Sequence, residues 1–434
     1  MKGKTEKMKR NFDYTWVIVG VCFLMVLVCL GFASSTKSLF PDEIAKDLGT
    51  ERSLVSIGES CRYIATAIVN LFFGFLVAKF GPRKLIFAGF FSLVAANLLY
   101  SFATELWQIY LAGSLLGLGF AWTTTTMVGY VVGRWCPERK GTIMGIILAS
   151  NGIGGAIAIW LVGRMIDPNV VGTYRNAYRM IAIVIAVTAV IVLIFFRNSP
   201  KEESMGNSVQ TKKKRGKDWV GIEFSQATRR WYFWGACVCI FCSGLILQGS
   251  HGIVAMHFKD VGIDYSAVMG MMSFGSVLLA GAKLMTGILY DKFGLRLAAS
   301  LCTAFAVIST LMLAMVQGNS LGFALAVGFT VVGQFALPIE TIMLPLYASD
   351  LFGNHSYAKV LGIFVSVNVA GYAIGAPAFN LCYDLFGSYT PSLLLVAGVM
   401  AVILVLLQFV ISAAHKEQKK IENLLTEKKE NASL

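Results

Sequence analysis

Apolar residues dominate this chain in runs of about 20 residues, the length that an α-helix needs to cross a bilayer, and short polar turns separate the runs. Twelve runs can be distinguished. They lie near residues 15–40, 54–78, 85–104, 107–133, 141–164, 177–196, 231–257, 266–290, 297–317, 321–349, 358–382 and 391–413. A water-soluble fold cannot bury so many apolar helices. The pattern predicts an all-α membrane protein of twelve transmembrane helices in a lipid bilayer.

A polar segment at residues 197–230 separates the sixth run from the seventh. Its composition is typical of a solvated linker. We therefore expect two six-helix bundles, at residues 15–196 and 231–413, with tails at residues 1–14 and 414–434.

The two predicted halves repeat short motifs. GFLVAKFGPRK at Gly74–Lys84 and GILYDKFGLR at Gly287–Arg296 each join the second and third spans of their half. KGTIMG from Lys140 and YAKVLG from Tyr357 each open the fifth span of their half and precede a glycine-rich stretch. Such spaced similarity indicates a duplicated membrane unit, and its glycines permit close helix approach. The sequence predicts two pseudo-symmetric bundles that can move against each other.

The charge distribution predicts the orientation of these helices. The net charge is +13, and the Lys and Arg residues gather in alternate loops, in the linker and in both tails. The positive-inside rule then puts both termini and the linker in the cytoplasm, and we expect a plasma-membrane location. Because the basic residues lie in loops between apolar runs, membrane topology explains the positive net charge better than nucleic-acid binding does. We recognise no catalytic triad, nucleotide-binding domain, metal-ligand spacing or cofactor motif, so an enzyme is not expected.

The first repeated loop resembles the signature of the major facilitator superfamily, G-x-L-x-D-R-x-G-R-R. Ala78 stands where that family usually has Asp, whereas the second copy keeps its acid as Asp291. The resemblance extends over the whole chain and implies the major facilitator fold. Trp16 near the start of the first span, with Lys37 and Ser38 further along, indicates a narrower group within that superfamily. These residues are similar to those of the monocarboxylate transporters and the related oxalate/formate antiporters.

Two intramembrane cations are candidates for substrate binding. Lys283 lies eight residues before Asp291, which at 1.5 Å per residue is about 12 Å into the bilayer. The monocarboxylate transporters carry an Arg at the matching position, so the resemblance implies anion binding; a structural lysine is the alternative. Lys37 lies near the outer end of the first span and could equally be a plain interfacial lysine. The Lys-Ser match favours a role in substrate binding.

Glu340 is the acid that lies deep in the second half. A buried carboxylate is costly unless it takes a proton or pairs with a cation. Glu340 is therefore a candidate proton carrier, a candidate counter-ion to Lys283, or a structural residue. The proton-coupled transporters carry an Asp one turn before the cation, where this chain has Leu279. Proton symport through that position is excluded.

Other residues have candidate roles in gating or in lining a cavity. Glu59 and Arg62 are three residues apart and are expected to pair with each other. The expected cytoplasmic gate consists of Arg83, Arg139, Lys140 and Asp291. The candidate cavity-lining residues are Trp122, Asn151 and Asn368.

The resemblance implies a secondary transporter of small organic anions, of the lactate or pyruvate type, which works by alternating access as a monomer. Its partners would be a small carboxylate and, if transport is coupled, protons. An oxalate/formate-type exchanger is the alternative, although the eleventh span has no cation between Lys359 and Asp384. A nutrient receptor or a multidrug exporter fits less well, since long cytoplasmic extensions are missing and acids in the cavity are few.

Overall fold

The protein is all-helical in the part of the chain that the computed structural model describes, residues 2–37, 40–50, 52–136, 139–166, 170, 172–198 and 221–431. Ser38 and most of the expected linker, residues 199–220, lie outside these ranges. The helices are α1 (Lys2–Val26), η1 (Leu27–Phe32), α2 (Ala33–Ser35), α3 (Pro41–Leu48), α4 (Arg52–Leu71), α5 (Phe73–Phe80), α6 (Pro82–Phe102), α7 (Leu106–Thr123), α8 (Thr125–Trp135), α9 (Lys140–Met165), α10 (Tyr174–Phe195), α11 (Phe224–Ala227), α12 (Trp231–Asp260), α13 (Tyr265–Phe293), α14 (Leu295–Ala314), α15 (Ser320–Ala336), α16 (Pro338–Thr341), α17 (Met343–Phe352), α18 (Tyr357–Phe386) and α19 (Thr390–Asn431).

The length and hydropathy of these helices confirm the prediction of a multi-span membrane protein. Within the described residues, 11 helices are long and apolar enough to cross a bilayer. A twelfth span results if α4 and α5, which meet at a 62° bend, are counted together. The bend lies at Phe72, between the two helices. The sequence pattern located these spans but gave no sign of this bend.

The chain divides into two compact units. The first comprises Met1–Lys214 and Met269–Asp291, and the second comprises Arg215–Val268 and Lys292–Leu434. Most of α13 therefore belongs to the first unit, although it lies in the second half of the sequence. The domain boundaries expected at residues 197–230 remain a prediction.

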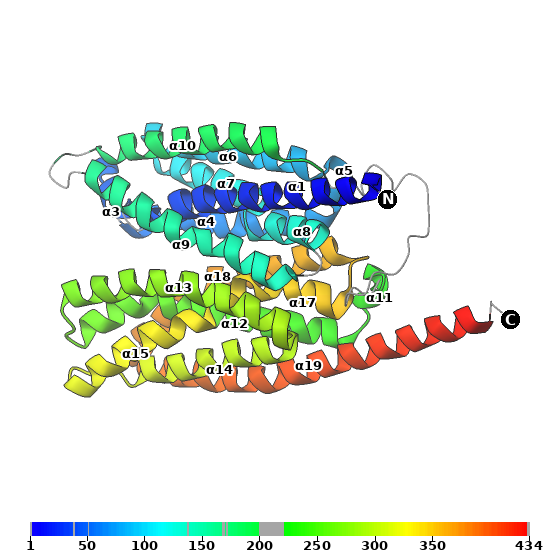
Figure 1. Cartoon of the computed structure of the whole chain (residues 1–434). Coiled ribbons are helices and arrows are strands. Elements are labelled where there is room, and N and C mark those ends of the chain that lie inside the picture. The colour runs from blue at the N-terminus through cyan, green and yellow to red at the C-terminus, as the bar shows by residue number, and fades with distance from the viewer. Residues whose placement is uncertain are drawn as a thin grey trace. The chain divides into compact units, whose positions relative to one another are not determined.

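Glycines bring helices of the first unit into close contact. Figure 1 shows α1, α6, α7 and α10 side by side, and η1 packs on α9. A Cβ atom added at Gly31 would lie 2.6 Å from the Cα atom of Gly154, and one added at Gly154 would meet the carbonyl oxygen of Leu27. The π-helical turn η1 and the glycine-rich part of α9 therefore fit together only without side chains at these positions.

The second unit uses its glycines in the same way. Its helix α18 packs along α12, and α14 packs on α15 and α19. A Cβ atom at Gly375 would lie 2.5 Å from the carbonyl oxygen of Leu245, and one at Gly371 would meet the carbonyl oxygen of Phe241. The same contact thus occurs in both halves. The glycines of the fifth span, which follow its repeated opening motif, pack against the first span of that half. The expectation that these glycines permit close approach is confirmed.

The two repeated loops also share a backbone conformation. Gly81 precedes α6 with φ 75°, and Gly294 precedes α14 with φ 83°. Positive φ values of this size are unfavourable for residues with a Cβ atom. The glycine that both copies of the motif retain is therefore needed for the turn between two antiparallel spans.

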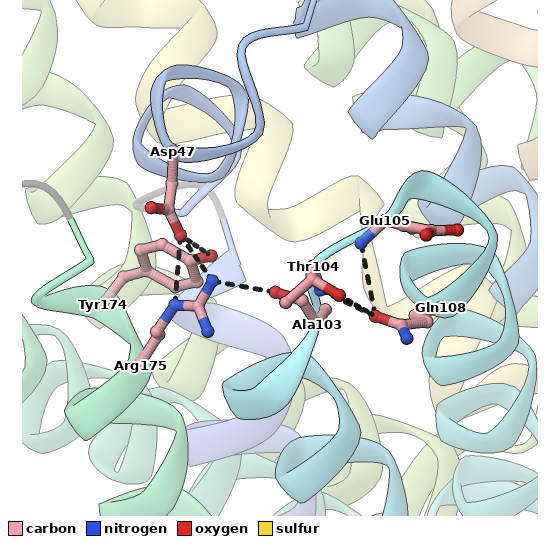
Figure 2. Close-up of polar contacts among 7 residues, drawn as sticks. All are labelled: Asp47, Ala103, Thr104, Glu105, Gln108, Tyr174 and Arg175. Atoms are coloured by element: carbon pink, nitrogen blue, oxygen red, sulfur yellow. Dashed lines mark hydrogen bonds and ion pairs between the residues drawn. The ribbon is translucent and has the colours of Figure 1, made fainter.

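The short helix α3 is tied to the ends of two longer helices. Asp47 of α3 accepts hydrogen bonds from the Tyr174 hydroxyl at 2.8 Å and from Nε and Nη2 of Arg175 at 3.1 and 2.8 Å. The same Nη2 donates to the carbonyl oxygen of Ala103 at 2.9 Å, as Figure 2 shows. Arg175 at the start of α10 thereby links α3 to the end of α6.

Candidate functional site

Lys283 lies within α13 and its side chain is buried, with 4% of the residue exposed. Its Nζ atom donates a hydrogen bond to the carbonyl oxygen of Leu148 in α9 at 3.4 Å. Within the described part of the chain it makes no ion pair. A charged amine without a counter-charge in a membrane span is unfavourable, and such residues commonly serve a ligand. The position can therefore accept an anion.

The helices around Lys283 approach each other through glycines. A Cβ atom at Gly145 of α9 would lie 2.9 Å from the carbonyl oxygen of Lys283, and one at Gly141 would lie 2.5 Å from that of Gly287. One at Gly152 would lie 3.2 Å from the Cβ atom of Ala280. Successive turns of α9 thus contact α13, and small movements between the two helices would directly change the surroundings of Lys283.

Asp291 lies at the end of this contact. Its Oδ1 accepts a hydrogen bond from the backbone N–H of Gly141 at 3.0 Å, and its Oδ2 accepts one from Thr142 at 2.7 Å. Arg139, the residue that precedes α9, makes no side-chain cap. The carboxylate of Asp291 therefore serves as the N-terminal cap of α9 from another helix, where a negative charge also interacts favourably with the helix dipole.

The other expected gate residues have different surroundings. Arg83 donates from Nη2 to the carbonyl oxygen of Leu193 at 2.9 Å, so it joins the start of α6 to the end of α10. Arg139 is exposed, whereas Lys140 is buried in the first turn of α9. Among the expected gate residues, Asp291 is the one whose side chain accepts hydrogen bonds across the α9–α13 contact, from the backbone N–H groups of Gly141 and Thr142.

Lys37 forms an ion pair, which the sequence did not predict. Its Nζ atom lies 2.6 Å from Oε2 of Glu59 in α4, and Oε1 of Glu59 pairs with Nη2 of Arg62. The expected pairing of Glu59 with Arg62 is confirmed. We call these three residues the triad. Lys37 is thus a member of a charged cluster and not an isolated cation.

Glu340 lies in the short helix α16, between two interruptions of the tenth span. Only 6% of the residue is exposed. Its Oε1 atom is buried and has no hydrogen-bond partner among the described residues. A carboxyl group with these surroundings can hold a proton.

Trp122, Asn151 and Asn368 are the expected lining residues. The Nε1 atom of Trp122 is buried without a hydrogen-bond partner in the described chain, and Asn151 accepts a hydrogen bond from Ser35 at 3.4 Å. Asn368 donates to the carbonyl oxygen of Ile240 at 3.3 Å and lines a small pocket inside the second unit. Asn151 and Asn368 thus bind residues of the first span of their own half.

Three curated relatives resemble the chain over most of its length. An uncharacterised MFS-type transporter, YcxA of Bacillus subtilis, is 26% identical over 88% of this chain and 91% of its own. The oxalate:formate antiporter of Oxalobacter formigenes is 20% identical over 95% of this chain and 96% of its own. Rat monocarboxylate transporter 13 is 22% identical over 88% of this chain and 85% of its own.

Solved structures support the fold. The proton:xylose symporter XylE superimposes with a TM-score of 0.74 at 12% identity, over 92% of this chain and 96% of its own. At that identity the likeness concerns the fold alone. The sequence profile of the Major Facilitator Superfamily matches residues 21–376 and, in a second match, residues 237–433. The chain therefore belongs to the Major Facilitator Superfamily and is a transporter with the fold of that family.

Proposed function

We propose that the protein is a secondary active transporter of small monocarboxylates, of the lactate or pyruvate type. The observation that carries this proposal is Lys283, a buried ammonium group without an acidic partner in the described chain. A carboxylate of the substrate would supply the missing counter-charge. Relatives named as a monocarboxylate transporter and an oxalate:formate antiporter handle the same chemical class.

In this proposal the contact between α9 and α13 opens and closes during alternating access. The Asp291 cap and the glycine contacts would hold the cytoplasmic side closed in the outward-open state. Separation of the two helices would then remove the cap and change the surroundings of Lys283 together. Substrate binding and gating are thereby linked through one pair of helices.

Glu340 is the candidate for proton coupling. Its burial and its unpartnered Oε1 are compatible with a neutral carboxyl group that can release its proton. A role as counter-ion to Lys283 is the alternative. We propose both termini in the cytoplasm, a plasma-membrane location and a monomeric transporter.

An oxalate/formate-type exchanger is the second candidate, because the oxalate:formate antiporter of Oxalobacter formigenes matches nearly the whole chain. A doubly charged substrate would need a cation in the eleventh span, as the resemblance to exchangers of that type implies. The eleventh span offers none between Lys359 and Asp384. We therefore favour a monocarboxylate over a dicarboxylate.

Counterflow in proteoliposomes tests the proposal, with labelled lactate, pyruvate, formate and oxalate offered one at a time. We expect counterflow of the monocarboxylates by the wild type, and at least about a tenfold loss in Lys283→Ala, since hydrogen bonds to charged groups contribute about 1.5–3 kcal/mol. Lys283→Arg keeps the charge and should retain part of the activity. Lys419→Ala, at an exposed position near the end of α19, is the matched control. Unchanged counterflow in Lys283→Ala would refute the binding role.

A further inference from the structure

The triad contains two cations and one acid. Lys37 and Arg62 both pair with the carboxylate of Glu59, one on each oxygen. With all three groups ionised, the triad carries one positive charge in excess. The residues lie at the end of the first span and in α4, within the first unit.

Most of this charge is shielded from the surroundings. The side chains of Lys37 and Arg62 are 17% and 10% exposed. The Nε atom of Arg62 is buried and has no hydrogen-bond partner among the described residues. A buried guanidinium donor without an acceptor is costly, and an anion would satisfy both the donor and the excess charge.

Aromatic rings surround the two cations. The guanidinium carbon of Arg62 lies 4.2 Å from the ring centre of Tyr63 and 5.5 Å from that of Phe120. The Nζ atom of Lys37 lies 5.7 Å from the same Phe120 ring. These rings hold the cations in place by cation–π attraction but provide no second carboxylate. Within the described residues, Glu59 is the anion that the triad possesses.

Glu59 is the most accessible member of the triad, with 38% of its side chain exposed. The triad is therefore most open on the side on which Glu59 lies. Each oxygen of Glu59 accepts from a single nitrogen of one cation, so other donors remain on both cations. An incoming carboxylate would compete with Glu59 for these cations and would also accept from the free Nε–H of Arg62.

We propose that the triad is a second anion subsite, occupied in turn with Lys283, in which the carboxylate of a monocarboxylate substrate binds Arg62 and Lys37, with Glu59 as the resident counter-ion that it partly displaces. The inference rests on the proposed transport function. It adds Arg62 as a binding residue and Glu59 as an internal competitor. The single excess charge matches a monoanion, whereas oxalate would leave the subsite with a net negative charge.

Equilibrium binding to the purified full-length protein in nanodiscs tests this subsite, with labelled pyruvate as the probe and oxalate as competitor. Arg62→Gln leaves the neutral Lys37–Glu59 pair, and we expect pyruvate binding to weaken at least about tenfold. Arg62→Lys keeps the charge without the Nε donor and should weaken binding less. Glu59→Gln removes the competitor, and pyruvate should bind more tightly, by about three- to tenfold. Oxalate should compete better in Glu59→Gln than in the wild type.

Glu43→Gln is the matched control, because Glu43 also forms an ion pair with a residue three positions away, Lys46, outside the triad. It should bind pyruvate like the wild type. Pyruvate binding that is unchanged in Arg62→Gln, or weakened in Glu59→Gln as much as in Arg62→Gln, would overturn the subsite. If the wild type still performs counterflow in that case, the transport proposal stands. Absence of monocarboxylate counterflow in the wild type would instead overturn the transport proposal itself.

Discussion

The carboxylate of Asp291 caps the N-terminus of α9 by accepting a hydrogen bond from the backbone N–H of Gly141 at 3.0 Å. The donor belongs to the motif that opens the fifth span, and the acceptor belongs to the second copy of the loop motif. The first copy has Ala78 instead of an acid. The second copy of the loop motif can therefore cap a helix through its Asp291 side chain, whereas Ala78 of the first copy has no group that could do so.

Replacement of Asp291 by Asn should weaken this cap. The neutral amide loses the charge interaction with the start of α9, and such caps contribute about 0.5–2 kcal/mol. We expect the amide protons of Gly141 and Thr142 to exchange faster with solvent by about two- to thirtyfold. Hydrogen exchange followed by mass spectrometry, on peptides from the start of α9, measures this change. The start of α7, capped by Glu105, is the internal control. The cap would be contradicted if the amide protons at the start of α9 exchanged at the same rate in Asp291→Asn as in the wild type.

Gly141→Ala should separate α9 from α13. The new Cβ atom would lie 2.5 Å from the carbonyl oxygen of Gly287, and no side-chain rotation can relieve a clash with backbone. We expect a lower melting temperature, from an overpacking cost of about 1–3 kcal/mol, and slower counterflow.

Gly163→Ala on the same helix is the matched control, because a Cβ atom there meets nothing within 4 Å. Alanine also has a higher helix propensity, by about 0.8–1 kcal/mol. This variant should therefore be as stable as the wild type or more stable. If the two variants behaved alike, the proposed role of the α9–α13 contact would be wrong.

Glu340→Gln should separate substrate binding from proton coupling. Glutamine imitates the protonated carboxyl group but cannot release a proton. We expect counterflow of pyruvate close to that of the wild type and loss of pyruvate accumulation driven by a pH gradient. Glu105→Gln is the matched control at an exposed acid. Full accumulation in Glu340→Gln would exclude a coupling role, and loss of counterflow would favour the role as counter-ion.

The link between Asp47 and Arg175 should make stability dependent on pH. Partial burial acts to raise the pKa of Asp47, but hydrogen bonds from Arg175 and Tyr174 outweigh it and hold this pKa below its ordinary value. A lowered pKa in the folded state means that the link stabilises the protein above the unfolded pKa, about 3.9. The stabilisation is then lost as the pH falls through the folded pKa.

Melting curves between about pH 3 and 7 should reveal this contribution. We expect Asp47→Asn to be less stable than the wild type at neutral pH, by about 1–3 kcal/mol. The difference should shrink as the pH falls below about 4. Tyr174→Phe removes one neutral donor and leaves the ion pair, so its loss should be smaller. A difference between wild type and Asp47→Asn that stays constant with pH would contradict this assignment.

The sequence by itself determined the helical class, the location of the spans and the repeated glycine turns. These features depend on local properties: the length of an apolar run, and the φ value that a tight turn requires at Gly81 and Gly294. The pairing of Glu59 with Arg62 was predictable for the same reason, because residues three apart share a helix face. The resemblance to the family signature then implied how these spans are arranged over the whole chain, and the family match agrees with it.

Only the tertiary structure decided which side chains meet across helices. Lys37 pairs with Glu59 of the next span, and Asp291 caps a helix 150 residues away in the chain. The bend at Phe72 and the π-helical turn beside Gly154 also depend on packing. An apolar run specifies that a helix spans the membrane but not the rotation of that helix about its axis. The partners of its few charged residues are therefore determined by the packing of neighbouring helices.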